Sequence, residues 1–465
     1  MSGTFFGIGV AQSGLAAQKR AMEVLGYNVA HANDPTYKRQ RVVVNEGMVV
    51  AQSQEAGIGG AMSIGTGVST SDIERVRDTL VESRLRDASQ GAAQWDYMSS
   101  TMKQIEAAIG EPSDSGLQTN LDKFWSSWTA VSNTPDDLAV RNNLLQDTQT
   151  MCQQIQYVYS QMGNIKQDVN SALQDRVGNV NLIANQISQL NTEIGTLQSG
   201  QMPVNDLLNR RDALVMDLSK IVSINQTGED PSNFIISIGG RVLVQGTKVN
   251  ELESKLDANN NATVTWKDDG KDVLFSGGEM KAMTDIRDNM IPDYMAQLDN
   301  VASTLVTQVN TLHRTGKDYT GADGGDFFKV GTTAANITLD DNIIGNPKLI
   351  AASGDGKIGD NSVALDIVDL KNTQVSNGLT IDQIYSNFVS SVASSTSVAD
   401  TQSSAHQLTA EQYTQQQQSV SGVSLDEEMG NMIKFQQAYN AASRSLTAMD
   451  DMLSTLIDKT GLVGR

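Results

Sequence analysis

The feature that most constrains the fold of this chain is an apolar heptad repeat between Ser424 and Lys459. One position of the repeat holds Leu425, Met432, Tyr439, Leu446 and Leu453, and the position three residues later holds Glu428, Phe435, Ala442, Met449 and Leu456. This 3.5-residue spacing, held over five heptads, predicts a long helix whose narrow apolar stripe packs along another helix. Ser424 and Glu427 have the spacing of a capping box. At ~1.5 Å per residue the helix would be roughly 50 Å long, so we expect it to need a partner.

A candidate partner lies at the other end of the chain. Heptad positions there are filled by Ile8, Leu15, Met22 and Val29, and the positions three residues later by Ala11, Gln18, Leu25 and Ala32. We therefore expect the two ends to pair as a coiled coil. The alternative is two amphipathic helices that pack on separate cores.

Composition excludes several classes of partner and site. A length of 465 residues allows about three domains, and the net charge of -20 argues against a nucleic-acid or anionic-membrane partner. A single cysteine, Cys152, excludes a disulfide framework. No stretch approaches the ~18 to 20 apolar residues that cross a bilayer, and no basic residue precedes the first apolar run, as a secretory signal would require. We expect a soluble protein or one exported without a cleaved signal.

The segment after the first helix is less regular. Asn33, Asp34 and Pro35 end that helix, residues 39–44 form an extended run, and the Gly-rich residues 55–70 suggest a loop or short hairpin. We expect a second helix from near Ser71 to Ile109. Heptads then continue through the helical residues 117–224, which is typical of long helices in a bundle.

A small β element interrupts the helices. Phe234–Ile238 and Arg241–Val244 flank Gly239 and Gly240, which predicts a hairpin. We expect a second hairpin between residues 264–266 and 272–275. Helix resumes over 285–313 and from 381, and the intervening residues 317–378 suggest loops and brief strands. The predicted fold is mainly α with a smaller β part (α+β): a long helical bundle or coiled coil of the terminal segments, and a middle helical domain with inserted β elements.

Residues that could carry chemistry have structural explanations. The three histidines stand in separate segments without metal-ligand spacing, and His313 fits the end of a helix, where a partly charged imidazole suits the dipole. The pairs Arg211-Asp212 and Arg287-Asp288 suggest bundle ion pairs or surface charges. Asp-Gly loops at 323–326 and 355–360 lack the ligand pattern of an EF-hand. We therefore expect no enzyme, no cofactor and no metal.

Four groups of residues follow one another in an order that points to a family. The first is Gly14-Leu15 with Asn28, Ala30, Asn33, Pro35, Tyr37, Arg39 and Gln40. The second is the run from Leu207 to Val215, and the third holds Arg287-Asp288, Ile291-Pro292, Leu298-Asp299, Asn310, His313, Gly316 and Asp326-Phe327-Phe328. The fourth is the run from Gly422 to Met429 followed by Phe435 to Tyr439.

Together these groups resemble the flagellar hook-associated protein 1 family, the first of the hook-filament junction proteins, from end to end. The first group is similar to the signature of flagellar axial proteins, with His31 in place of the usual Asn and Thr36 in place of the usual Gly. The residues that match the family motifs are Asn28, Asn33, Pro35, Tyr37, Leu207, Leu208, Arg211, Asp212, His313, Gly316, Phe327 and Phe328.

The resemblance implies a structural, non-enzymatic subunit of the bacterial flagellum, secreted through the flagellar channel. It implies self-assembly into a ring at the hook tip, with the hook protein, the next junction protein and an export chaperone on the C-terminal helix as partners. The candidate assembly interface is the two terminal stripes: Ile8, Leu15, Met22, Val29, Leu425, Met432, Phe435, Tyr439, Leu446, Met449, Leu453 and Leu456. Weak stripe members such as Ala11 and Gln18 suggest that the ends order only when neighbouring subunits cover them.

Alternatives and domain limits follow from the same residues. A secreted coiled-coil adhesin or effector would explain the helices but not the ordered motifs. Hook and rod proteins have mainly β middle regions, and the third junction protein lacks the second motif combined with Asp326-Phe327-Phe328. We expect a terminal coiled-coil domain (1–50 plus 405–465), a middle helical domain (51–230 plus 285–404) with a reduced outer region around 329–380, and a β hairpin element at 231–284.

Overall fold

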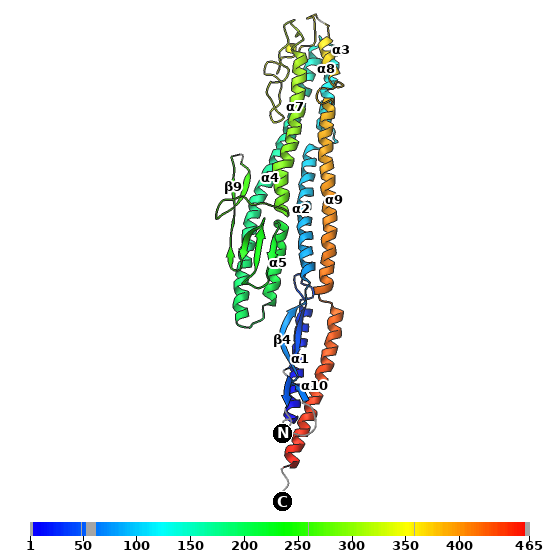
Figure 1. Ribbon diagram of the computed structural model, residues 1–465. Helices are drawn as coiled ribbons and strands as arrows, with labels where there is room; N and C mark the ends of the chain where they lie inside the picture. Colours follow the sequence, from blue (N-terminus) through cyan, green and yellow to red (C-terminus); the bar gives the residue numbers. More distant parts are fainter. Residues whose placement is uncertain (1–2, 48, 53–61, 259, 358, 461–465) are drawn as a thin grey trace.

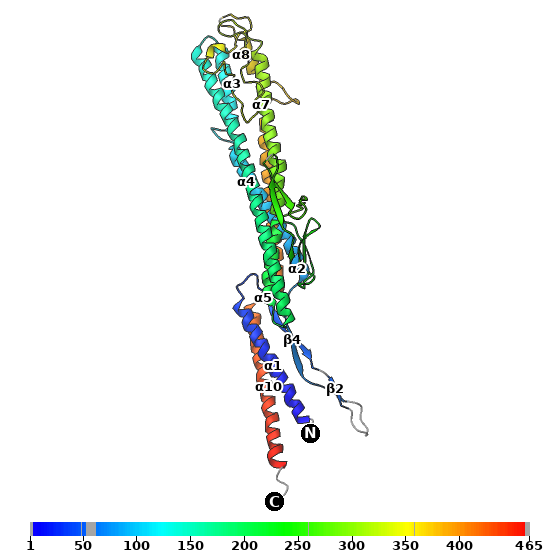
Figure 2. The same cartoon turned by 90° about the vertical axis from the view of Figure 1, so that its left-hand side faces the viewer.

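A computed structural model describes the whole chain except residues 1–2, 48, 53–61, 259, 358 and 461–465. The molecule is long and narrow, with both termini at the same end (Figure 1). Two helices and a β ribbon form the terminal part, and a rod of longer helices carries a β module on its side (Figures 1 and 2). The predicted fold class, mainly α with a smaller β part, is confirmed.

The terminal part pairs the two ends of the chain. Helix α1 (Gly3–Ala30) runs toward the rod and α10 (Leu425–Thr460) runs away from it, so the two lie side by side and antiparallel (Figures 1 and 2). Each carries an apolar stripe that a single helix cannot bury, which is the physical reason for the pairing. The predicted pairing of the ends is confirmed for the two helices of one chain.

The ribbon beside these helices was only partly predicted. Strand β1 (Gln40–Glu46) pairs antiparallel with β4 (Val68–Arg75), and β2 (Val49–Gln52) pairs with β3 (Met62–Gly65). The expected helix start near Ser71 is therefore wrong, because Ser71 lies in β4 and helix α2 (Thr79–Ile109) begins later, where the Asp78 carboxylate caps it.

Gly67 lets the β ribbon lie directly against α1. Gly67 has φ of +97°, and a Cβ there would lie 2.3 Å from the Ser13 Oγ. The same hydroxyl accepts a hydrogen bond from the Val68 N–H at 3.2 Å. Only glycine allows this approach of backbone to helix.

The rod is built from long helices. After α2 come α3 (Leu117–Asn133), α4 (Leu138–Ser199, 62 residues), α5 (Asn205–Ile221), α6 (Glu279–Asp285), a π-helical turn (Ile286–Met290), α7 (Ile291–His313) and α9 (Ile381–Ser421). Helix α9 runs along α2, and Thr380 and Gln383 form a capping box at its start (Figure 1). The heptad residues of α4 are buried, and they include Leu144, Met151, Val158, Ile165, Leu173, Val180, Ile187 and Ile194.

The β module contains two sheets. Strands β5 (Asn225–Thr227), β6 (Ile235–Ile238), β7 (Arg241–Gln245) and β8 (Lys248–Val249) form one antiparallel sheet in that order, which confirms the first predicted hairpin. The second predicted hairpin has the wrong partner. Strand β10 (Ala262–Trp266) pairs with β9 (Leu252–Leu256), whereas residues 272–275 contribute one isolated bridge, from Asp272 to Thr265.

Loops dominate the end of the rod that lies away from the termini. Residues 317–378 contain isolated bridges and a 3-10 turn (Pro347–Leu349), as expected, and also a short helix that was not predicted, α8 (Ser362–Asp369). Phe327 and Phe328 are fully buried there against α3, and the ring of Phe124 lies 6.4 and 6.1 Å from theirs.

Candidate functional site: the joint between the terminal helices and the rod

The side chain of Asn28 is the centre of the joint where α1, β1 and α10 meet. It is buried, and its Oδ1 accepts hydrogen bonds from the Tyr37 hydroxyl at 2.7 Å and the Gln40 N–H at 2.9 Å. Its Nδ2 donates to the Gln40 carbonyl at 2.9 Å and to Glu428 Oε2 at 3.3 Å. Because donor and acceptor are both satisfied, this buried amide fixes three segments at once.

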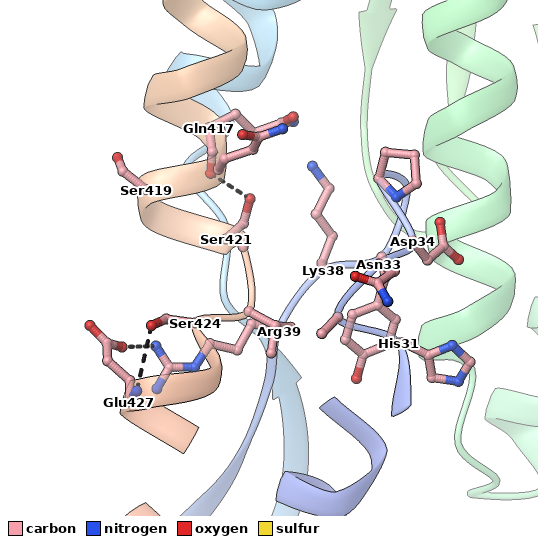
Figure 3. Close-up of a pocket in the computed structure, with 16 residues that line it drawn as sticks. His31, Asn33, Asp34, Lys38, Arg39, Gln417, Ser419, Ser421, Ser424 and Glu427 are labelled. Carbon is pink, nitrogen blue, oxygen red and sulfur yellow. Dashed lines mark hydrogen bonds and ion pairs between the residues drawn. The ribbon is translucent and has the colours of Figure 1, made fainter. Parts of the chain in front are cut away.

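Arg39 connects the same network to the start of α10. Its Nε lies 2.8 Å from Glu428 Oε1 and its Nη1 lies 2.9 Å from Glu427 Oε2, while its backbone N–H donates to the Ser421 carbonyl at 2.9 Å. Glu428, the one polar member of the predicted C-terminal stripe, is 3% exposed. The expected capping box is half present: Ser424 Oγ accepts from the Glu427 N–H at 3.5 Å, but the Glu427 carboxylate turns to Arg39 (Figure 3).

The turn after α1 is held by its own side chains. Asp34 Oδ1 accepts from the Thr36 N–H at 2.9 Å and the Thr36 hydroxyl at 2.7 Å, which is an Asx turn. Asn33 and Pro35 are exposed in this turn. The His31 ring stacks on Tyr37, with 5.0 Å between centroids.

Tyr27 links α1 to the rod. Its hydroxyl donates to Asp206 Oδ2 on α5 at 2.6 Å, and this hydrogen bond raises the pKa of Tyr27 to about 12. The phenol therefore stays protonated and keeps donating through the ordinary pH range.

A polar pocket of about 540 Å³ lies between the turn after α1 and the connection from α9 to α10 (Figure 3). Residues 31–39 line one side and residues 417–427 the other. The end of α9 and the turn after α1 therefore do not pack closely against each other at this point.

A second polar layer joins the turn after α1 and strand β4 to the rod helices α2 and α5. Glu82 is buried; its Oε1 forms an ion pair with Lys38 Nζ at 2.9 Å, and its Oε2 accepts from Arg77 Nη2 at 2.7 Å. On α5, Asp212 Oδ2 accepts a hydrogen bond from Arg75 Nη1 at 2.7 Å, and the two side chains form an ion pair. Buried charges need such partners, so this layer fixes how the strands sit on the rod.

The family-motif residues of α5 contact different partners from those expected. Leu207 and Leu208 are half-buried. Arg211 is 1% exposed and bonds Asn191 Oδ1 at 2.9 Å and the Glu229 carbonyl at 2.7 Å, above the Phe234 ring.

Arg211 is thus not paired with Asp212, and burial lowers its pKa to about 10. The other Arg-Asp pair does form an ion pair, because Arg287 Nε and Nη2 bond the two Asp288 oxygens at 2.7 and 2.8 Å.

The third motif group lies far from the joint, at the loop end of the rod. His313 is fully buried, with Nδ1 2.7 Å from the Gly325 carbonyl and Nε2 accepting from the Ala351 N–H at 2.8 Å. Burial lowers the pKa of His313 to about 4. The expected partly charged imidazole is therefore wrong, since the ring is neutral near pH 7. A Cβ on the neighbouring Gly316 would lie 3.0 Å from the Ala351 Cβ.

The terminal stripes divide into two groups by exposure. Ile8, Leu15, Met22, Met432, Phe435, Leu446, Met449 and Leu453 are half-buried, whereas Val29, Leu425, Tyr439 and Leu456 are exposed. Further apolar residues on α10 that the heptad pattern missed are also exposed: Met429, Ile433, Met452 and Ile457. A Cβ on Gly7 would meet Met449 Sδ at 2.9 Å, so the two helices approach closely there.

Other groups that could hold a ligand have partners within the protein. In the described ranges no cluster of three or more His, Cys, Asp or Glu side chains could hold a metal ion, and no helix combines the length and apolar content needed to span a membrane. Asp360 accepts from Ser353, Gly354 and Ser362, and these bonds hold the pKa of its carboxyl well below its usual range. Cys152 is buried, which raises the pKa of its thiol to about 12.

Comparisons with known proteins cover the whole chain. The profile of the flagellar hook-associated protein FlgK helical domain matches residues 102–328, and that of the flagellar basal body rod FlgEFG protein C-terminal matches residues 414–459. Flagellar hook-associated protein 1 of Bacillus subtilis (strain 168) is 28% identical over 511 residues, which cover 100% of each chain. The protein of the same name from Salmonella typhimurium is 24% identical and covers 96% of this chain and 98% of its own.

A solved structure shares the fold. The flagellar hook junction protein FlgK from Burkholderia pseudomallei superposes with a TM-score of 0.65 at 17% sequence identity, covering 72% of this chain and 100% of its own.

Proposed function

This chain belongs to the flagellar hook-associated protein 1 family, and from that premise we propose that it forms the junction between the hook and the filament of the bacterial flagellum. It is a structural protein and not an enzyme, like its relatives. The proposal extends to the way it assembles: the paired ends, α1 and α10, are the part that neighbouring subunits complete.

One observation carries the assembly proposal: α10 is only partly covered by α1. Five apolar side chains on α10 have exposed fractions between 51% and 70%, and they are Leu425, Met429, Ile433, Met452 and Ile457. Single exposed apolar residues are ordinary on a protein surface, but a set of them along one helix marks an association surface. A further copy of the chain that packs against α10 would bury them.

The partners follow from this surface and from the family. We propose self-assembly into a ring at the hook tip, with the hook protein on one side and the next junction protein on the other. Before assembly, an export chaperone would bind the apolar stripe of α10. An amphipathic helix can lay its apolar face into a hydrophobic groove of a partner protein. This route places the protein outside the cell, in the flagellum.

We also propose that assembly is coupled to folding. The terminal part contributes few large, fully buried side chains, whereas the rod holds most of the core. An isolated helix pair with this little buried area is marginal in water. Contact with neighbours would therefore supply the free energy that orders α1 and α10. The division into a terminal domain, a middle domain and a β element stays a proposal on the same grounds.

The direct test is binding to isolated hooks. Purified protein is added to hooks that lack junction proteins, and their ends are viewed by electron microscopy. We expect a cap at the distal end of each hook. Absence of a cap, with normal circular dichroism of the protein, would refute the junction role.

A further inference from the structure

The joint contains a second, smaller pocket, of about 110 Å³. It opens where the turn after α1 meets α2, α5 and the end of α9. Its charged lining residues are Lys38, Arg77, Arg86, Glu82 and Asp212. The pocket therefore carries three basic and two acidic side chains, in a chain whose net charge is -20.

Both carboxylates that line the pocket already form ion pairs within the chain. Glu82 forms ion pairs with both Lys38 and Arg77, at 2.9 and 2.7 Å. Asp212 accepts from Arg75, which lies outside the pocket lining, at 2.7 Å. Among the described residues neither acid forms an ion pair with Arg86, although Glu82, Asp212 and the adjacent Asp87 attract its charge.

Arg86 is the basic lining residue that has no direct ion pair among the described residues. It is half-buried on α2, and Glu82, Asp212 and Asp87 act on its charge without such a pair. Its hydrogen-bond partner is the neutral Gln226 side chain, through Oε1. Burial lowers the pKa of Arg86, which is the mark of a cation with incomplete compensation. A guanidinium offers five N–H donors, so most of its donors can take a further ligand.

We propose that this pocket binds a carboxylate side chain, Asp or Glu, from a second copy of the chain, with Arg86 as its main partner. The inference rests on the proposed self-assembly. Charge complementarity identifies the occupant, because the surplus charge of the pocket is positive and the rest of the chain is strongly acidic. The small volume suits one side chain rather than a helix, and Arg pairs with carboxylates in a two-pronged geometry.

The test compares Arg86→Gln with Arg84→Gln. Arg84 is an exposed arginine on the same helix, so the control removes the same charge two residues away. Binding of each purified variant to isolated hooks, and self-association by sedimentation, are measured between about 0.05 and 0.5 M NaCl, a range over which screening of exposed charges changes strongly. We expect Arg86→Gln to weaken both by at least about tenfold at low salt and to flatten the salt dependence. Arg84→Gln should behave like the wild type.

Two further measurements separate a binding role from a structural one. Thermal unfolding followed by circular dichroism reports whether Arg86→Gln still folds. Arg86→Lys keeps the positive charge but lacks the paired N–H donors of the guanidinium, so this variant should recover only part of the binding. Gln226→Ala removes the internal partner of Arg86. If Arg86 acts only through its hydrogen bond to Gln226, then Gln226→Ala would weaken hook binding and self-association as much as Arg86→Gln does, and the proposal would be overturned. If Arg86 binds a carboxylate of a second copy, Gln226→Ala should leave binding unchanged.

The outcomes also distinguish this inference from the junction role. Wild-type protein that caps hooks, together with Arg86→Gln that caps them equally well at every salt concentration, would overturn the carboxylate site and keep the junction role. Wild-type protein that neither caps hooks nor self-associates would overturn both.

Discussion

Arg39 and the buried Glu428 form an ion pair between the two ends of the chain, with 2.8 Å between Nε and Oε1. Glu428 is 3% exposed and also accepts from the Asn28 amide. A single polar residue in an apolar heptad stripe fixes the register of two helices, because any other alignment leaves it buried without partners. The contact therefore sets how α10 lies against α1.

Replacing Glu428 with Ala tests this role. The change removes the buried carboxylate that pairs with Arg39 Nε and accepts from the Asn28 amide, so we expect the free energy of unfolding of the terminal helices to fall by about 1–3 kcal/mol. Glu427→Ala is the matched control, because Glu427 bonds the same guanidinium but its side chain is 64% exposed; its loss should cost at most about 1 kcal/mol. Amide exchange of α10 measures both, and equal effects would contradict the register role.

Two glycines of α1 predict opposite results for the same substitution. Nothing lies within 4 Å of a Cβ on Gly9, so Gly9→Ala should stabilise the helix by about 0.5–1 kcal/mol. A Cβ on Gly7 would lie 2.9 Å from Met449 Sδ, so Gly7→Ala should gain less or lose stability. Helicity during thermal unfolding measures both, and an equal gain would show that α1 and α10 do not approach as described.

The buried His313 predicts a pH dependence of the rod. Its pKa is lowered to about 4 in the folded chain, and histidine in an unfolded chain titrates near pH ~6.5. The unfolded state therefore binds more protons between these values. Stability is complete above pH ~6.5 and falls toward pH 4, by an amount on the order of 3 kcal/mol. Urea unfolding at several pH values should show this slope, and it should flatten in His313→Gln. An unchanged slope in that variant would assign the effect elsewhere.

The buried Cys152 predicts resistance to thiol reagents. Its side chain is 3% exposed and its pKa is raised to about 12, so the reactive thiolate is rare in the native protein. We expect the native rod to be labelled by a disulfide reagent at least about a hundred times more slowly than the urea-unfolded chain. Rapid labelling of the native protein would mean that this part of α4 opens often.

Heptad spacing predicted the helices well because their pattern is local. The buried residues of α4 and the paired stripes of α1 and α10 follow from side chains three and four residues apart. The strands were harder. Residues 68–75 are mostly polar and pair with β1 across about 30 residues, which local pattern does not predict. Strand β10 lies equally near β9 and residues 272–275 in the sequence, so spacing alone could not choose its partner.

The joint could be located from the sequence but not described. The motif residues Asn28 and Tyr37 were named, and their hydrogen bond to each other was not foreseen. Arg211 and Asp212 are neighbours in sequence, yet consecutive residues of a helix point in different directions, so each found a distant partner. Arg86 has no motif signal at all. Its position beside the pocket appears only when the turn after α1, α2, α5 and the end of α9 are brought together.

The most direct test of the central claim is amide hydrogen exchange of the same protein, free in dilute solution and bound to isolated hooks. If the ends order on assembly, the amides of α1 and α10 exchange rapidly in the free protein and become protected on hooks, while those of α2, α4, α7 and α9 are protected in both. Strong protection of α1 and α10 in the dilute free protein, unchanged on hooks, would contradict the claim.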